Sequence, residues 1–210
     1  MSQEKVEVAP VAIDATTVRI PAIHHVNLKT TRLQELVDWY GVVVGSKPNF
    51  QFPGGAFLSN DAANHRIALI ALPVFDDDAD RVTHTGVHHV AFEYDSLDDL
   101  LSTYLRLKKE GITPGGCLDH GLTMSFYYFD PDNNGVELQA DNYGDWSEST
   151  RFIREDPRFA ADPIGKPVDP EALVEARRSG LSPWEVHERA YEGAYPPSDG
   201  FDIRFPLPQE

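Results

Sequence analysis

Apolar and polar positions follow the same pattern twice along the chain. A short alternating stretch around His25 precedes apolar positions at helical spacing and then Gly41, and a second stretch around His89 precedes the same pattern and then Gly111. Strands alternate with period two, amphipathic helices repeat every 3.6 residues, and glycine commonly follows a helix. Each half therefore predicts a short strand followed by an amphipathic helix.

Short alternating segments, bounded by glycine and proline, follow each predicted helix. Such segments are typical of strands joined by turns. We expect these strands at residues 49–52, 56–59 and 65–72, and again at residues 116–119, 124–129 and 136–140. The chain thus predicts an α+β fold of two tandem βαβββ modules, residues 20–75 and 86–140, after an arm of residues 1–19. A polar linker, residues 76–85, joins the modules, and their sheets are expected to form a curved mixed-sheet cup.

The C-terminal part, residues 141–210, has a different pattern. It holds nine of the sixteen prolines and two helices with clear end signals. The first helix is predicted to begin after Asp169 and to end before Gly180, and the second begins after Ser182, which forms a capping box with Glu185. Neither helix has enough apolar surface for a core of its own. We therefore expect a helical, proline-rich extension that wraps the modules or a neighbouring subunit.

A repeated His-His-Val motif, residues 24–26 and 88–90, places candidate metal ligands on the strands. Side-chain alternation puts His25, His89 and, on the last predicted strand, Glu137 opposite the apolar faces. If the apolar faces pack on the helices, all three side chains point to the concave face. Two histidines and one carboxylate form a ligand set that leaves positions of the metal open to substrate and oxygen.

Simpler interpretations exist for the same residues. A polar residue on a strand such as Glu137 commonly faces water, and a buried histidine is more often hydrogen-bonded than a ligand. The repeated motif could also be a duplicated structural element. Three potential ligands on matching faces favour a metal site, but the spacing alone leaves both interpretations open.

The composition limits the classes of function. A net charge of −16 argues against nucleic acid as a partner, because phosphate binding needs clustered Lys and Arg. A single cysteine, Cys117, excludes an internal disulfide. There is no apolar run of the roughly 20 residues that a membrane span needs, and the N-terminus lacks the pattern of a signal peptide. We therefore expect a cytoplasmic enzyme or small-molecule binding protein without a membrane partner.

One segment of the second module carries a family signature. Residues 120–131, followed by Glu137, resemble the signature of type I extradiol catechol dioxygenases, which are members of the vicinal oxygen chelate superfamily built from paired βαβββ modules. That signature contains a histidine, a tyrosine, an Asp-Pro pair and a glutamate, and its tyrosine corresponds to Tyr127. Residues 65–69 also resemble the His-x-x-Ala-apolar strand of the family. The resemblance covers roughly residues 20–140.

Two positions depart from the signature. Asn133 stands where the family usually has glycine in the turn after Asp-Pro, and Leu118 stands where the signature prefers a small residue, Asn, Val or Ile. Asparagine tolerates the left-handed conformation, so we expect the hairpin to form. The chain has one module pair, as in the one-domain members, and the C-terminal extension has no counterpart in the signature.

The resemblance implies a non-haem iron enzyme of aromatic-compound catabolism. It would insert both atoms of O2 into a small catechol-type aromatic diol and cleave the ring. Fe(II), with Mn(II) as the main substitute, would be held by His25, His89 and Glu137. We also expect a homo-oligomer.

The resemblance also assigns catalytic roles. His65 is the candidate beside the bound oxygen, and His120 is the candidate facing the substrate oxygens. Tyr127 would hydrogen-bond a diol oxygen. Histidine suits such roles because it exchanges protons near neutral pH. We expect substrate specificity to depend on residues 50–57 and 142–146, whose aromatic side chains suit an aromatic ligand.

Other functions are possible on the same scaffold. A glyoxalase or epimerase would need a Gln or Glu ligand on the last strand of the first module, and residues 66–72 contain none. A non-catalytic sequestering protein would lack the metal triad. We interpret His84 and His187 as exposed or structural, and Cys117 as a packing residue.

Overall fold

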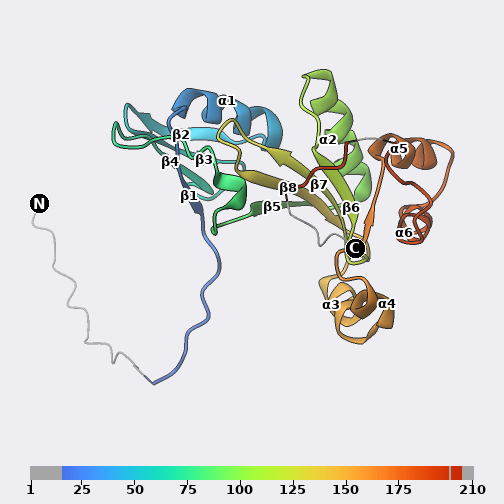
Figure 1. The fold of residues 1–210 in the computed structure, drawn as a ribbon. Coiled ribbons are helices and arrows are strands. Elements are labelled where there is room, and N and C mark those ends of the chain that lie inside the picture. The colour runs from blue at the N-terminus through green and yellow to red at the C-terminus, as the bar shows by residue number, and fades with distance from the viewer. Residues whose placement is uncertain (1–15, 199, 205–210) are drawn as a thin grey trace, which may run out of the picture.

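The computed structural model describes residues 16–198 and 200–204, which form two mixed β-sheets with helices packed on them (Figure 1). The first sheet has the strand order β1-β4-β3-β2, with β1 and β4 parallel and the other neighbours antiparallel. Helix α1 (Leu33–Val44) connects β1 to β2. The strands are β1 (Val26–Lys29), β2 (Lys47–Phe52), β3 (Gly55–Ser59) and β4 (Ile67–Ile70).

The second sheet repeats this arrangement and adds one strand. Its order is β5-β8-β7-β6-β9, again with one parallel pair, β5 and β8. Helix α2 (Leu97–Lys109) follows β5. The strands are β5 (His89–Tyr94), β6 (Gly116–Asp119), β7 (Thr123–Phe129), β8 (Gly135–Asp141) and β9 (Lys166–Pro167). The predicted α+β fold of two βαβββ repeats is therefore confirmed.

The two sheets are not joined by strand pairing. β1 pairs with β4 and β5 pairs with β8, so β1 and β5 are the inner edges of their sheets. They run near one another at the middle of the molecule (Figure 1). The cup expected from the sequence is therefore open along these edges, because each module satisfies its strand pairing within itself.

The ends of the helices follow local signals. Ser96 caps α2 by accepting a hydrogen bond from the Asp99 amide, as a cap at this position requires. The prediction that the first helix ends at Gly41 was wrong, since α1 continues for another turn to Val44. Gly45 ends it with a φ of 68°, a left-handed conformation that glycine adopts without strain.

The described part of the C-terminal extension, residues 141–198 and 200–204, contains four helices. The two predicted ones are α5 (Pro170–Arg178) and α6 (Pro183–Tyr191), and both hydrogen bonds of the Ser182–Glu185 capping box are present. Sequence reasoning missed α3 (Trp146–Glu155) and α4 (Pro157–Ala161). α3 has only three large apolar residues, Trp146, Phe152 and Ile153, so a search for apolar positions at helical spacing does not find it. The Asp-Pro signal that predicted α5 also precedes α4 and could have revealed it.

The extension packs on the second module. β9 extends the second sheet by pairing with β6, and Arg177 of α5 donates a hydrogen bond of 2.6 Å to Asp98 of α2. Apolar residues of the extension join the main buried cluster, namely Val168, Leu173, Val174, Ala176, Val186 and Ala190. The expected wrapping of the modules is therefore observed on the second module.

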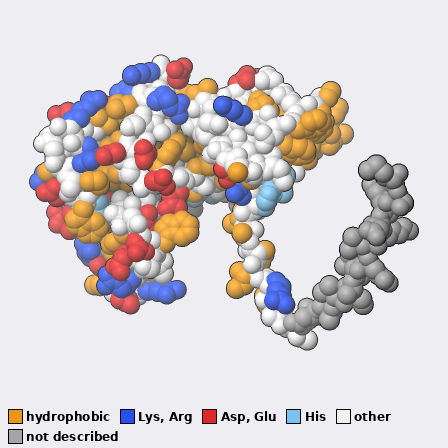
Figure 2. Space-filling model, turned by 180° about the vertical axis from the view of Figure 1, so that it is seen from behind, with side chains coloured by type: hydrophobic (Ala, Val, Ile, Leu, Met, Phe, Trp, Pro, Cys, Tyr) orange, Lys and Arg blue, Asp and Glu red, His pale blue; other side chains and the backbone are white. Residues whose placement is uncertain are grey.

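One surface of the protein carries an extended arm. Residues 16–25 lead away from β1, and Val18, Ile20 and Ile23 are each more than 85% exposed (Figure 2). The first 15 residues of the predicted N-terminal arm lie outside the described residues. Within the described part of the chain, none of the helices is long and apolar enough to cross a membrane.

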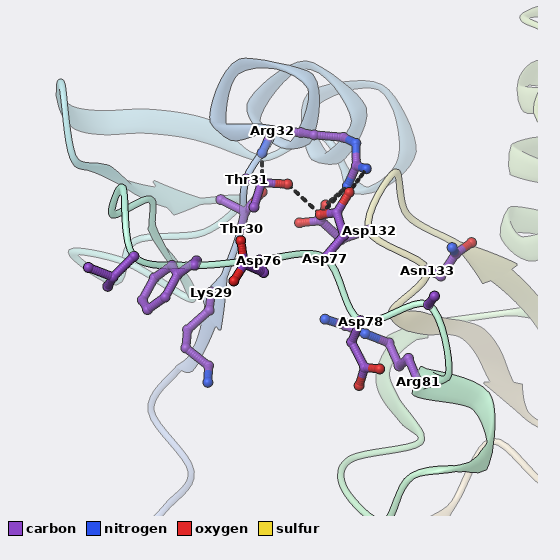
Figure 3. Close-up of a pocket in the computed structure, with 13 residues that line it drawn as sticks. Lys29, Thr30, Thr31, Arg32, Asp76, Asp77, Asp78, Arg81, Asp132 and Asn133 are labelled. Carbon is purple, nitrogen blue, oxygen red and sulfur yellow. Dashed lines mark hydrogen bonds and ion pairs between the residues drawn. The ribbon is translucent and has the colours of Figure 1, made fainter.

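The linker between the modules is held by charged contacts (Figure 3). Arg32, at the start of α1, bonds to Asp77 of the linker and, at 2.5 Å, to Asp132 of the β7–β8 turn. Arg81 bonds to Asn134 of the same turn. Arg32 thus pairs with two carboxylates, Asp77 and Asp132, and ties the first module to the linker and to the second module.

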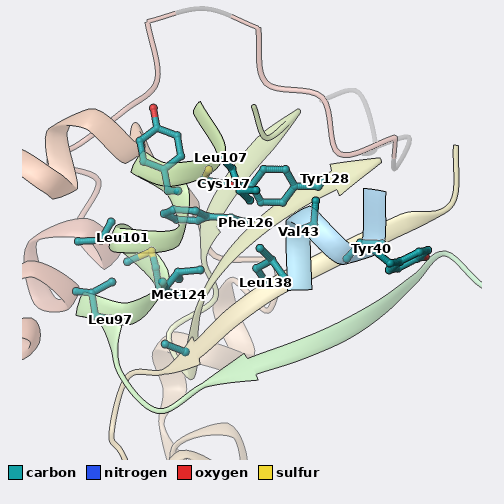
Figure 4. Close-up of a cluster of buried hydrophobic side chains, with 14 of the residues drawn as sticks. Tyr40, Val43, Leu97, Leu101, Leu107, Cys117, Met124, Phe126, Tyr128 and Leu138 are labelled. Atoms are coloured by element: carbon teal, nitrogen blue, oxygen red, sulfur yellow. The ribbon is translucent and has the colours of Figure 1, made fainter. Parts of the chain in front are cut away.

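The main core lies between the helices and the sheets (Figure 4). Tyr40 and Val43 of α1 and Phe126 and Tyr128 of β7 are all almost completely buried in one cluster. The core faces of the two modules therefore share one apolar interior, and the opposite faces of the strands are left for polar groups.

Candidate active site

Three neighbouring strands of the second sheet bring polar side chains together. Tyr127 of β7 lies directly opposite Glu137 of β8, and β8 in turn pairs in parallel with β5, which begins at His89. Phe126 and Tyr128 point into the core, so alternation turns Tyr127 to the other face. The predicted parity of this strand is therefore observed.

These side chains form a continuous hydrogen-bonded chain. Nε2 of His89 lies 2.9 Å from Oε2 of Glu137. The Tyr127 hydroxyl donates to Oε1 of Glu137 at 3.1 Å and lies 2.7 Å from Nε2 of His120. Nδ1 of His120 then bonds to the Ile164 carbonyl at 2.6 Å. Four of the six residues predicted for the site are thus connected.

The carboxyl group of Glu137 is buried yet favours its charged form. Burial raises the pKa of Glu137, but hydrogen bonds from His89 and Ser125 outweigh burial, so that the pKa lies below its ordinary value. An ionised carboxylate in contact with an imidazole is a pair of donors that suits a divalent metal ion.

The other two groups of this chain remain neutral. Burial lowers the pKa of His120, against the opposing effect of the Glu137 charge. Burial and the same charge raise the pKa of Tyr127 far above its ordinary value. A neutral imidazole beside a protonated phenol is an arrangement that can pass a proton in either direction.

The first module contributes a second cluster of histidines. Ligand atoms of His24, His25 and His65 all lie within 4.8 Å of one another, as in a group that could hold a metal ion. The His25 and His65 rings are 4.4 Å apart between centroids. Desolvation, together with the charges of the other two rings, lowers the pKa of His65 and so favours its neutral form.

His25 and His89 line one cleft between the inner edges of the sheets. The structure brings His89 into contact with Glu137, and His25 into contact with His65. Two histidines and one ionised carboxylate are the right donor types for Fe(II) or Mn(II). That one ion is held jointly by His25, His89 and Glu137 stays a prediction.

A small cavity of about 220 Å³ lies beside the polar chain. Its polar wall is formed by His88, His89, His120 and Tyr127, and its apolar wall by Leu118, Ile164 and Ile203. Ile164 and Ile203 belong to the C-terminal extension. Sequence reasoning missed both, because no pattern in the chain connects them with the modules.

A row of aromatic side chains leads from the edge of the first sheet to His65. Phe50 and Phe52 are partly exposed on β2, and the ring of Phe57 lies 6.5 Å from that of Phe50 and 5.0 Å from that of His65. Figure 2 shows hydrophobic side chains gathered at this end of the molecule. The row lies within the predicted specificity segment, residues 50–57.

The remaining candidates have structural contacts. His187 is fully buried and bonds to Asp119 at 2.8 Å, His84 is exposed and bonds to Asp78, and Cys117 is buried in the core. Asn133 has a φ of 64°, so the left-handed conformation expected at this departure from the signature is adopted. These observations agree with the sequence interpretation of each residue.

Comparisons with known proteins support the family resemblance of the sequence. A model of the Glyoxalase/Bleomycin resistance protein/Dioxygenase superfamily matches residues 22–138. The chain is 36% identical over 171 residues to biphenyl-2,3-diol 1,2-dioxygenase 3 of Rhodococcus globerulus, covering 81% of this chain and 90% of that protein. It is 36% identical over 160 residues to biphenyl-2,3-diol 1,2-dioxygenase 2 of the same organism, covering 76% and 83%.

A solved structure supports the fold. A glyoxylase/bleomycin resistance protein/dioxygenase domain from Frankia sp. EAN1pec superposes with a TM-score of 0.50 at 21% identity, over 59% of this chain and 93% of that one. At this identity the likeness concerns the fold alone.

Proposed function

The chain belongs to the glyoxalase/bleomycin resistance protein/dioxygenase superfamily, and from this we propose that it is a non-haem Fe(II)-dependent extradiol dioxygenase that cleaves a catechol-type aromatic diol. The hydrogen-bonded chain from His89 through Glu137 and Tyr127 to His120 carries the proposal. It places an ionised carboxylate, a phenol and a neutral imidazole beside a cavity. The two relatives, named as dioxygenases of an aromatic diol, support the same reaction.

In this function His25, His89 and Glu137 hold the iron, with Mn(II) as the alternative. When bound, the ion supplies electron transfer between the diol and O2. Glu137 contributes a negative charge to the site, and the hydrogen bonds that lower its pKa keep it ionised at neutral pH. His25 reaches the site from the other wall of the cleft it shares with His89.

Protons are handled by the remaining side chains. Tyr127 donates a hydrogen bond to a diol oxygen, since its raised pKa keeps the phenol protonated. His120 accepts a proton from the diol through its neutral ring. His65, beside His25, is the group that faces the oxygen molecule, and its lowered pKa favours its neutral form.

The substrate is proposed to be an aromatic vicinal diol with a second apolar group. Ile164 and Ile203 give the cavity an apolar wall, and the aromatic row that ends at Phe57 offers flat surfaces for a ring. Apolar walls with a few polar groups are typical of pockets for such ligands.

A glyoxalase or epimerase fits these observations less well. Such an enzyme would take a further ligand from the last strand of the first module. On that strand, β4, Ala68 occupies the position equivalent to Glu137 of β8. It lies opposite Phe57 of β3, and its side chain offers no atom that could bind a metal. A sequestering protein has no use for the polar chain around Glu137.

The test is anaerobic reconstitution of the protein with Fe(II), followed by 2,3-dihydroxybiphenyl and air. We expect a yellow ring-fission product and consumption of one O2 per diol. The His89→Ala variant should lose both bound iron and turnover. His84→Ala is the matched control, since His84 is exposed and lies on the linker. Full iron content and full turnover in His89→Ala would overturn the ligand assignment, and activity on a hemithioacetal instead of a diol would overturn the reaction.

A further inference from the structure

The loop that carries His120 is enclosed by the C-terminal extension. β9 pairs with β6 so that Lys166 lies opposite Asp119, the residue before His120. A side chain at Gly121, the residue after it, would meet Phe152 of α3 at 2.6 Å and Tyr191 of α6 at 3.0 Å. The extension therefore contacts this loop through three of its elements.

The extension also contacts the imidazole itself. Nδ1 of His120 lies 2.6 Å from the backbone carbonyl of Ile164. A carbonyl oxygen can only accept a hydrogen bond, so Nδ1 must carry the proton. The partner of one ring nitrogen thus determines which nitrogen is protonated.

With the proton on Nδ1, Nε2 of His120 is able to accept a hydrogen bond or a proton. With its one proton on Nδ1, the neutral ring of His120 has a lone pair on Nε2, 2.7 Å from the Tyr127 hydroxyl. The single proton of that hydroxyl can therefore point either to Nε2 of His120 or to Oε1 of Glu137. Nε2 lies on the side of the cavity that Tyr127 and His89 also line. The basic nitrogen is thereby directed at the site and the protonated nitrogen at the extension.

Close packing of the extension depends on Gly165. A Cβ at this position would lie 2.0 Å from the Asp119 carbonyl oxygen and 2.7 Å from Cα of His120, and the φ of Gly165 is +85°. Any side chain here must push Ile164 away from His120. A glycine is therefore required for the carbonyl to reach Nδ1.

Hydrogen bonds to Asp119 anchor the loop on the side before His120. Asp119 is completely buried, and it accepts hydrogen bonds from the Gly121 amide, from the Asn142 side chain and, at 2.8 Å, from His187 of α6. With Asp119 held this way, the loop has little freedom to follow Ile164 if the extension moves.

We propose that the C-terminal extension is a positioning element of the active site, which sets the tautomer of His120 through the Ile164 carbonyl and so makes Nε2 the proton acceptor that faces the substrate. Ile164 acts through His120 and is not itself catalytic. The role of the acceptor rests on the proposed function, whereas the tautomer does not.

The tautomer can be measured directly on the full-length, metal-free protein labelled with ¹⁵N in its histidines. Two-bond ¹H–¹⁵N correlations show which ring nitrogen carries the proton, and the signals of His120 are those missing in His120→Gln. We expect the Nδ1–H form in the wild-type protein. An Nε2–H ring, or a doubly protonated one at neutral pH, would overturn the proposal.

A pair of glycine variants tests the cause. Gly165→Ala should lose the Nδ1–H form and lower kcat about 10- to 100-fold, as is usual when a group supporting an active-site histidine is lost. Gly193→Ala is the matched control, since Gly193 has a φ of +84° but open space around its Cβ position. It should keep both the tautomer and kcat.

The outcomes separate this proposal from the proposed function. If Gly165→Ala keeps the Nδ1–H form and the kcat of Gly193→Ala, the extension does not set the tautomer. If Gly165→Ala does not fold, the wild-type spectrum decides. A wild-type protein that shows the Nδ1–H form but cleaves no diol contradicts the proposed function and leaves the assignment of the tautomer intact.

Discussion

The two modules share a fold but differ at equivalent positions of their sheets. In the second module Glu137 lies beside Ala91 of β5 and opposite Tyr127 of β7. In the first module the equivalent position is occupied by Ala68, which lies beside Asn27 of β1 and opposite Phe57 of β3. The first module therefore has an alanine and a phenylalanine where the second has a carboxylate and a phenol.

Both modules nevertheless keep the adjacent histidines. Nδ1 atoms lie 3.1 Å apart between His24 and His25, and 2.8 Å apart between His88 and His89. In the second module this motif also contacts Glu137 and the extension, whereas in the first it faces His65. A duplicated strand thus supplies a histidine twice, and the neighbouring strands decide what surrounds each copy. The resulting centre is asymmetric, with its carboxylate on one side.

The largest effect is expected from removing the histidine of the first module. If His25 is a ligand across the cleft, His25→Ala should lose more than the roughly 10- to 100-fold in metal affinity that loss of a supporting group costs. Turnover should fall with it. His84→Ala is the matched control, because His84 is exposed and lies on the linker, away from this cluster. Metal content by mass spectrometry and turnover are the readouts; equal losses in the two variants would mean that the first module supplies no specific ligand.

A smaller effect is expected from the phenol that distinguishes the second module. Tyr127→Phe should lower kcat about 10²- to 10⁴-fold, the usual contribution of a group that handles a proton, while the metal content stays unchanged. Its neighbour Tyr128 provides the control, since its hydroxyl is buried in the core and has no hydrogen-bond partner among the described residues. Tyr128→Phe should keep kcat and should not lower stability. A Tyr127→Phe enzyme as active as Tyr128→Phe would remove Tyr127 from the mechanism.

The smallest effect concerns how closely β5 and β8 approach. Gly135 lies beside His89, and a Cβ there would be 2.4 Å from the His88 carbonyl oxygen. Gly135→Ala should lower the free energy of unfolding by about 1–3 kcal/mol, as overpacking usually does. Gly86→Ala, at a position with open space, should change it little. Urea unfolding measures both, and equal midpoints would show that the two strands can separate without cost.

The extension adds to the contrast between the modules. It pairs with β6, packs on α2 and contacts His120, all of which belong to the second module. The extension therefore covers part of the second module, including the loop of His120. In the first module, by contrast, His24 and His25 are exposed at the end of the arm. This difference explains why the two halves of the candidate site are not equally enclosed.

Much of the fold could be predicted from the sequence because it depends on neighbours along the chain. The period of apolar residues located the strands of both modules, and caps such as Ser96 and Ser182 located the ends of helices. Alternation also predicted that Tyr127 turns away from the core. Where apolar residues are few, as in α3, the prediction missed the element.

Other features required the tertiary structure, because they join residues far apart in the chain. Nothing near His120 indicates that the carbonyl of Ile164, 44 residues later, sets its tautomer. That His25 and His89 line one cleft also depends on how the two sheets lie against one another. Residue types and periods determined which groups face the site. Strand register and the packing of the extension decided which of those groups touch.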